Sequence, residues 1–157
     1  MRLRFSTRKE FELIDITHLI NQKIRESGIK DGIVVIFTRH TTTALFINEN
    51  ESGLFEDVRE FFQSLIPKGK GYKHDRIDRN AHSHLRSIIL NPSLSIPIKD
   101  GKLLLGTWQS VIFAELDGPR RRRIFINLPM LTFFFPNLHL SKNKKSARQK
   151  ILNFVTS

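Results

Sequence analysis

The stretch GIVVIFTRHTTTALFIN, residues 32–48, decides the fold of this 157-residue chain. Its first seven residues, Gly32–Thr38, form a continuous apolar run of strand length that is rich in β-branched side chains, which predicts a buried strand. Residues Thr42–Asn48 predict a second strand on the same grounds. The polar triplet Arg39-His40-Thr41 lies between the two runs, so we expect it at the entrance of the second strand.

Helical periodicity flanks this stretch on both sides. Apolar residues recur at helical spacing between Asp15 and Gly28, and Gly28 stands where a helix commonly ends. Residues 51–66 place their apolar side chains on one helix face before Pro67 stops the helix. A shorter helix is expected over residues 81–90.

The remaining apolar segments predict strands. Residues 2–14 suit a strand or hairpin, and further strands are expected near 94–98, 103–108, 110–116 and 123–128. The fold class is therefore α+β, a largely antiparallel, β-sandwich-like sheet with two or three helices in a single domain. The segment 67–80 is polar, contains glycine and is too long for a tight turn, so we expect a functional loop there.

Charge is distributed unevenly along the chain. Lys and Arg number 26 against 15 Asp and Glu, which gives a formal net charge of +11. Residues 118–157 hold nine Lys and Arg and no acidic residue, whereas residues 1–117 have a net charge of only +2. We expect a globular domain over 1–128 with a local anion site, and a basic extension over 129–157 whose end can form an amphipathic helix. Binding of nucleic acid is expected through that extension only.

Composition excludes several classes of protein. The chain has no cysteine, which excludes disulfides, iron–sulfur clusters and thiol nucleophiles and leaves His, Asp and Glu as the strong metal ligands. The N-terminus lacks the apolar core of a secretory signal, and no stretch reaches the ~18 continuous apolar residues of a membrane span. We therefore expect a cytoplasmic protein without a membrane span.

Four of the six histidines gather in the middle of the sequence. His40 lies between the two central strands, His74 lies in the polar loop, and His82 and His84 lie in the short helix. Three imidazoles from separate segments can hold a zinc ion and leave a fourth position open. Residues two apart on a helix point about 200° apart, so His82 and His84 cannot both face one ion. The spacing alone leaves structural or surface histidines as the more common alternative.

Two further groups of polar residues can carry chemistry. Glu49, Asn50 and Glu51 stand where a strand gives way to a helix, and they can bind an anion or act as a base or metal ligand. Helix capping, with Asn48 or Asn50 as the N-cap, is the structural alternative. Trp108 and Gln109 offer a stacking face and an amide edge to a flat heterocycle, with core packing as the alternative.

Four successive arginines, Arg120–Arg123, enter the last expected strand. Because side chains alternate along a strand, Arg121 and Arg123 share one face, and Arg120 and Arg122 share the other. One pair can clamp a phosphate while the other pair is solvated. Nucleic acid or an acidic partner are competing uses of the same run.

Five segments taken together closely resemble the YjbQ-like family, whose members carry the label secondary thiamine-phosphate synthase. The similarity covers residues 1–128, and the joint order of the motifs is highly specific for the family. The segments are HTTTALFINENE (40–51), YKHD (72–75), NAHSHLRSIIL (80–90), SLSIPIKDGKLLLGTWQ (93–109) and ELDGPRRRRIFI (115–126).

The resemblance implies an α+β subunit that assembles as a homotrimer with its site near the subunit boundaries. It also implies a divalent metal ion, zinc or magnesium, on His40, His74 and His84. The implied activity joins a hydroxymethylpyrimidine diphosphate to a thiazole phosphate and releases pyrophosphate.

These implications lead to a hypothesis with assigned roles. The chain is expected to be a metal-assisted enzyme that acts on a small phosphorylated heterocycle, as a thiamine-phosphate synthase does. The alternative is a basic binding module for RNA or another polyanion without catalysis, which the nearly neutral body of the chain disfavours. The catalytic candidates are Glu49, Glu51 and Arg123, and the substrate-binding candidates are Asn50, Trp108, Gln109 and Arg122.

Overall fold

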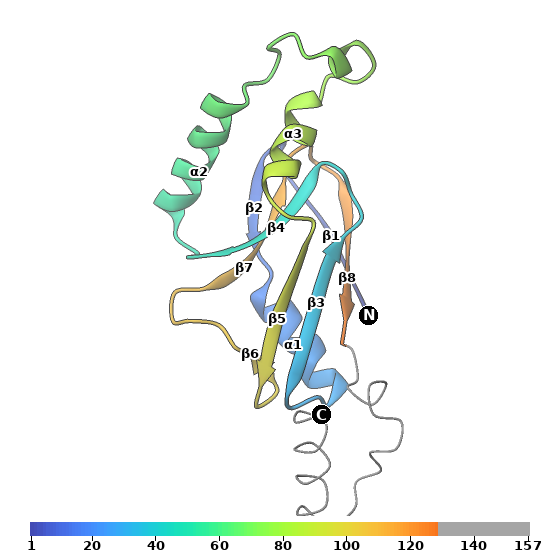
Figure 1. Cartoon of the computed structure of the whole chain (residues 1–157), viewed down its shortest axis with the longest axis vertical. Helices are drawn as coiled ribbons and strands as arrows, with labels where there is room; N and C mark the ends of the chain where they lie inside the picture. The colour runs from blue at the N-terminus through green and yellow to red at the C-terminus, as the bar shows by residue number, and fades with distance from the viewer. Residues whose placement is uncertain (129–157) are drawn as a thin grey trace, which may run out of the picture.

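Two antiparallel sheets and three α-helices make up residues 1–128, the part of the chain that the computed structural model describes (Figure 1). In chain order the elements are β1 (Arg2–Ser6), β2 (Glu12–Asp15), α1 (Thr17–Ser27), β3 (Gly32–Thr38), β4 (Thr43–Asn48), α2 (Ser52–Leu65), the 3-10 helix η1 (Lys73–Arg76), α3 (Ala81–Ile89), β5 (Ser93–Lys99), β6 (Lys102–Leu103), β7 (Ser110–Glu115) and β8 (Arg121–Asn127). The larger sheet has the order β1-β8-β3-β5-β6, and the smaller sheet has the order β2-β7-β4. The predicted α+β fold is confirmed.

The main core lies between the two sheets and includes α1. Val34 and Ile36 alternate along β3 so that both point inward, and both are fully buried. They belong to one cluster with Ile20 and Ile24 of α1 and Phe113 of β7. Removing one such side chain from water contributes about 1.5–3 kcal/mol. Figure 1 shows α1 behind β3 and β5, so this helix covers the inner side of the larger sheet.

A second, smaller core covers the opposite side of the smaller sheet. Phe62 of α2 packs there with Ala44 of β4 and Ala114 of β7. The Ser87 hydroxyl of α3 donates a 2.8 Å hydrogen bond to the carbonyl of Thr43, which ties this helix to the start of β4. Of the helices that the structure describes, none lies on the outer face of the larger sheet (Figure 1).

The predicted strand at 103–108 is wrong beyond its first residue. Only Lys102–Leu103 pair with β5, and the chain then forms a turn in which Gln109 accepts from the amide of Gly106 at 2.9 Å. Leu104 and Trp108 are exposed, at 58% and 72%. The amide of Leu104 still donates to the carbonyl of Pro97 in β5 at 2.8 Å, but Pro97 has no N–H to donate in return, and the paired strand does not continue.

Two sequence predictions concern membranes and the C-terminal end. Among the described helices, none is long and apolar enough to cross a membrane. The predicted basic extension, 129–157, lies outside the described residues, so its helix and its nucleic-acid binding stay predictions.

Candidate functional site

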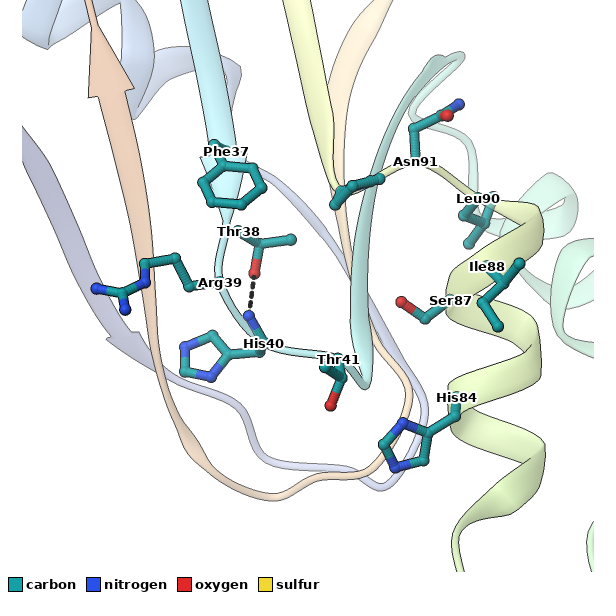
Figure 2. Close-up of a pocket in the computed structure, with 11 residues that line it drawn as sticks. Phe37, Thr38, Arg39, His40, Thr41, His84, Ser87, Ile88, Leu90 and Asn91 are labelled. Carbon is teal, nitrogen blue, oxygen red and sulfur yellow. Dashed lines mark hydrogen bonds between the residues drawn. The ribbon is translucent and has the colours of Figure 1, made fainter. Parts of the chain in front are cut away.

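Two hollows flank the turn that joins β3 to β4, and they share Arg39, His40, Thr41 and His84. The larger one, of about 480 Å³, is bounded by the residues that Figure 2 shows, with Phe37 and Ile88 on opposite walls. The smaller one, of about 330 Å³, is polar, and we call it the Thr41 pocket. Its lining is completed by Thr42, Asp78, Asn80, Asp117, Arg120 and Arg122.

Hydrogen bonds between buried threonines hold this turn. The hydroxyls of Thr38 and Thr43, the last residue of β3 and the first of β4, lie 2.6 Å apart. The Thr43 hydroxyl also lies 3.3 Å from the carbonyl of His40, and the amide of His40 lies 3.4 Å from Thr38 Oγ1. The threonine-rich sequence therefore fixes the backbone on which His40 is presented (Figure 2).

His40 is held as a neutral imidazole. The backbone N–H of Arg123 donates to His40 Nε2 at 3.1 Å, and this bond assigns the ring proton to Nδ1. Burial and then the positive charge of Arg122 lower the pKa of His40 below its ordinary value. A ring nitrogen that accepts this hydrogen bond is not free to bind a metal ion, so in this geometry His40 acts as a donor through Nδ1.

Arg122 forms a buried ion pair behind the Thr41 pocket. Its Nε and Nη2 donate to the Glu115 carboxylate at 2.6 and 2.5 Å, and Nη2 also donates to Thr42 Oγ1 at 3.1 Å. Glu115 is fully buried and Arg122 is 5% exposed. The guanidinium predicted to bind substrate is therefore largely occupied within the protein.

The two remaining predicted metal ligands meet on one side of the pocket. His74 of η1 and His84 of α3 are in edge-to-face contact, with ring centroids 4.9 Å apart. Asp75 positions them, since its carboxylate accepts from the amide of Ala81 at the start of α3. In the part of the chain that the structure describes, no three His, Asp or Glu side chains converge as a metal site. The residues of one subunit thus do not fit a three-ligand zinc centre, and the predicted metal stays a prediction.

His82 points away from this pair, as the helical spacing predicts. It is 2% exposed and lies 3.5 Å from Glu10. It takes no part in either hollow.

The other predicted site residues lie at the far end of β4. Ser110 pairs with Asn48 there, whereas Thr43 pairs with Glu115 at the end near His40. The rise of ~3.4 Å per residue puts about 17 Å between these two ends of β4. Glu49, Asn50, Glu51, Trp108 and Gln109 therefore form a second group, separate from the Thr41 pocket.

Residues of this second group are engaged locally. Glu51 is the N-cap of α2, where its carboxylate accepts from the amides of Gly53 and Leu54 at 2.7 Å each. These bonds lower the pKa of Glu51. Asn50 Nδ2 donates to Asp15 at 3.0 Å. The N-cap is therefore Glu51, in place of the Asn48 or Asn50 that the capping alternative named, and core packing does not describe the exposed Trp108.

Sequence reasoning missed several residues of the Thr41 pocket. Asp117 accepts from Arg120 Nη2 at 2.9 Å and from Asn80 Nδ2 at 3.0 Å. Glu115 was also missed, although a charged residue at an inward position of a buried strand signals a partner. Asn80, Glu115 and Asp117 belong to the motifs NAHSHLRSIIL and ELDGPRRRRIFI quoted above, from which only histidines and arginines were selected.

These features define a single-domain α+β protein with a ligand-sized polar pocket beside a strand turn. The family model described as UPF0047 protein YjbQ-like matches residues 1–130. The chain belongs to this family.

Relatives and solved structures agree with that membership. A UPF0047 protein of Archaeoglobus fulgidus is 50% identical over 126 residues, which cover 80% of this chain and 98% of that protein. The structure of a YbjQ-like protein of unknown function from Sulfolobus solfataricus P2 is 42% identical, with a TM-score of 0.78 over 80% of this chain and 92% of that one. A hypothetical protein from Aeropyrum pernix K1 is 36% identical, with a TM-score of 0.80 over 82% of this chain and 96% of that one.

The predicted thiamine-phosphate synthase-like activity is wrong. The family and these relatives are described as UPF0047 proteins or as proteins of unknown function, and nothing in them points to that activity. Within one subunit, Trp108 and Gln109, assigned to the pyrimidine, lie at the opposite end of β4 from His40 and Arg122, so a single subunit does not form the assigned site. The alternative, a basic module for RNA or another polyanion, gains no support either.

Proposed function

We propose that the Thr41 pocket binds a small phosphorylated ligand. The observation that carries the proposal is a set of hydrogen-bond donors without acceptors around one pocket. Within the residues that the structure describes, the backbone N–H groups of Thr41 and Thr42 donate to no acceptor, and neither does the guanidinium of Arg39. His40 adds a donor through Nδ1. Backbone amides next to a guanidinium form a common phosphate-binding arrangement.

The charges of the pocket support an anionic ligand. Arg120 balances Asp117, and Glu115 balances Arg122. Arg39 pairs with no carboxylate in the described structure. Its guanidinium carbon lies 5.6 Å from the centre of the Phe125 ring, which is a cation–π contact. Asp78 is exposed to solvent, where water screens its charge.

Binding of inorganic phosphate and of phenyl phosphate, measured by isothermal titration calorimetry, tests the proposal. Hydrogen bonds to charged groups contribute about 1.5–3 kcal/mol, so Arg39→Met should weaken binding about 10- to 100-fold. Arg25→Met is the matched control, because Arg25 is exposed on α1 and lies outside the pocket. Equal affinities for the wild type and Arg39→Met, or an equal loss in Arg25→Met, would refute the assignment.

We also propose that the protein acts as a homotrimer in the cytoplasm, as the sequence predicts. The division of the predicted site residues into two groups about 17 Å apart supports an assembly, since neighbouring subunits can bring together what one subunit separates. Exposed apolar side chains support it as well, among them Phe61 at 57%, Ile88 at 77% and Trp108 at 72%.

A further inference from the structure

Arginines on the outer face of the larger sheet have no acidic partner among the residues that the structure describes. We call this surface the arginine face. Arg2 and Arg4 of β1 and Arg121 and Arg123 of β8 occupy its exposed positions, and no outward position of β1, β3, β5 or β8 is acidic. The central strand β3 adds apolar side chains, with Ile33 49% and Phe37 41% exposed.

The arrangement of these arginines is unfavourable for an isolated subunit. Arg4 and Arg123 stand directly opposite each other in the β1–β8 register. Like charges at such positions destabilise a strand pair. None of the four arginines forms a salt bridge among the described residues. Arg2 makes a cation–π contact with Phe125, with its guanidinium carbon 5.4 Å from the ring centre. An anionic surface laid on this face would relieve the repulsion.

The exposed side of α2 has the complementary pattern, and we call it the α2 face. Glu56, Asp57 and Glu60 are exposed there, and none of them forms a salt bridge within the described part of the chain. Glu56 and Glu60 are four residues apart, so they repel each other along the helix. Phe61 and Leu65 add apolar surface at 57% and 51% exposure.

We propose that the α2 face of one copy packs on the arginine face of a second copy. Acidic and apolar side chains of the first then meet basic and apolar side chains of the second, which is the usual composition of a specific interface. The arginine face cannot pair with itself because its charges have one sign. We therefore expect a heterologous contact, which forms a ring where the rotation between neighbours closes, as a homotrimer requires.

This inference rests on the proposed homotrimer and names the surfaces that build it. It also connects the two groups of predicted site residues. Arg123 lies on the arginine face and donates to His40, whereas Glu51 caps α2. The interface would thus bring the second group of one subunit toward the Thr41 pocket of its neighbour.

Sedimentation velocity and light scattering on the full chain, without ligand, test the proposal. The paired variant Arg4→Glu/Arg121→Glu reverses two charges on the arginine face, and Glu56→Arg/Glu60→Arg reverses two on the α2 face. Each should weaken assembly about 100-fold, because like charges are then brought together. The fourfold variant that carries both pairs should assemble again. Lys70→Glu/Lys73→Glu, at exposed sites between α2 and α3 and outside both faces, is the control and should assemble as the wild type does.

The outcomes separate this interface from the ligand proposal and from simple misfolding. Circular dichroism checks that each variant is folded, and recovery in the fourfold variant cannot arise from misfolding. A monomeric wild type, assembly that survives both reversals, or failure of the folded fourfold variant to assemble overturns the interface. Phosphate binding by the wild type is measured separately, so an oligomer that binds no phosphate refutes only the proposed ligand.

Discussion

Replacing Arg122 by Met should leave the carboxylate of Glu115 buried without a cation. The two groups are joined at 2.6 and 2.5 Å, with Glu115 fully buried and Arg122 5% exposed. Removing one partner of a buried ion pair costs about 3–5 kcal/mol, because the remaining charge loses its partner and does not regain water. We expect Arg122→Met to lower the free energy of unfolding by about this amount.

Urea denaturation followed by circular dichroism measures this loss. Adding Glu115→Gln to Arg122→Met should recover part of it, because the neutral amide removes the buried charge and still offers an oxygen to Thr7, which donates to Glu115 at 2.9 Å. Lys99→Met is the control, since it breaks a pair with Asp31 in which both side chains are more than half exposed. An Arg122→Met loss as small as that of Lys99→Met, or no recovery in the double variant, would refute the reasoning.

Three further outcomes follow from the described geometry. Arg122→Met should also raise the pKa of His40 in an NMR titration, because Arg122 lowers it; an unchanged value would contradict the proximity of the two groups. In the wild type the lowered pKa of His40 makes the folded state lose stability as the pH falls below about 6.5. The amide hydrogen bonds at the start of α2 lower the pKa of Glu51, so their stabilisation is present above about pH 4.3 and is lost as the pH falls through the folded pKa. Glu51→Gln should reduce the loss of melting temperature that the wild type shows on acidification. The same loss in both proteins would contradict the stabilising role of the Glu51 cap. If the predicted metal is zinc, elemental analysis should find it in the wild type and in the control variant His18→Ala. The variant His84→Ala, which lacks a predicted ligand, should hold less zinc. A wild-type protein without zinc would refute this prediction.

Elements with strong local patterns could be predicted from the sequence. The strand expected at 32–38 is observed at Gly32–Thr38, and the helix expected at 51–66 is observed at Ser52–Leu65. The strand follows from a continuous apolar run and the helix from helical periodicity, and both patterns are local in the sequence. The prediction at 103–108 failed because apolar composition does not reveal where pairing with β5 stops, here beside Pro97, which has no N–H to donate.

The site was harder to predict because its contacts join distant segments. The contact between His74 and His84 depends on how η1 packs against α3, and the bond from Arg122 to Thr42 joins residues 80 positions apart. Sequence spacing contains neither fact. It did indicate which residue types matter, and the motifs included the missed partner Glu115.

The arginine run shows why a residue type alone does not assign a role. Alternation along β8 directs Arg122 inward to Glu115, while Arg121 and Arg123 remain exposed. Arg120 lies before the strand and pairs with Asp117. Two of the four positive charges are therefore neutralised within the subunit, one of them where a phosphate clamp was expected. The charges that an external partner can reach lie on the outer face of the larger sheet. Arg121 and Arg123 therefore contribute to the proposed assembly. Arg120 and Arg122 instead help to build the Thr41 pocket.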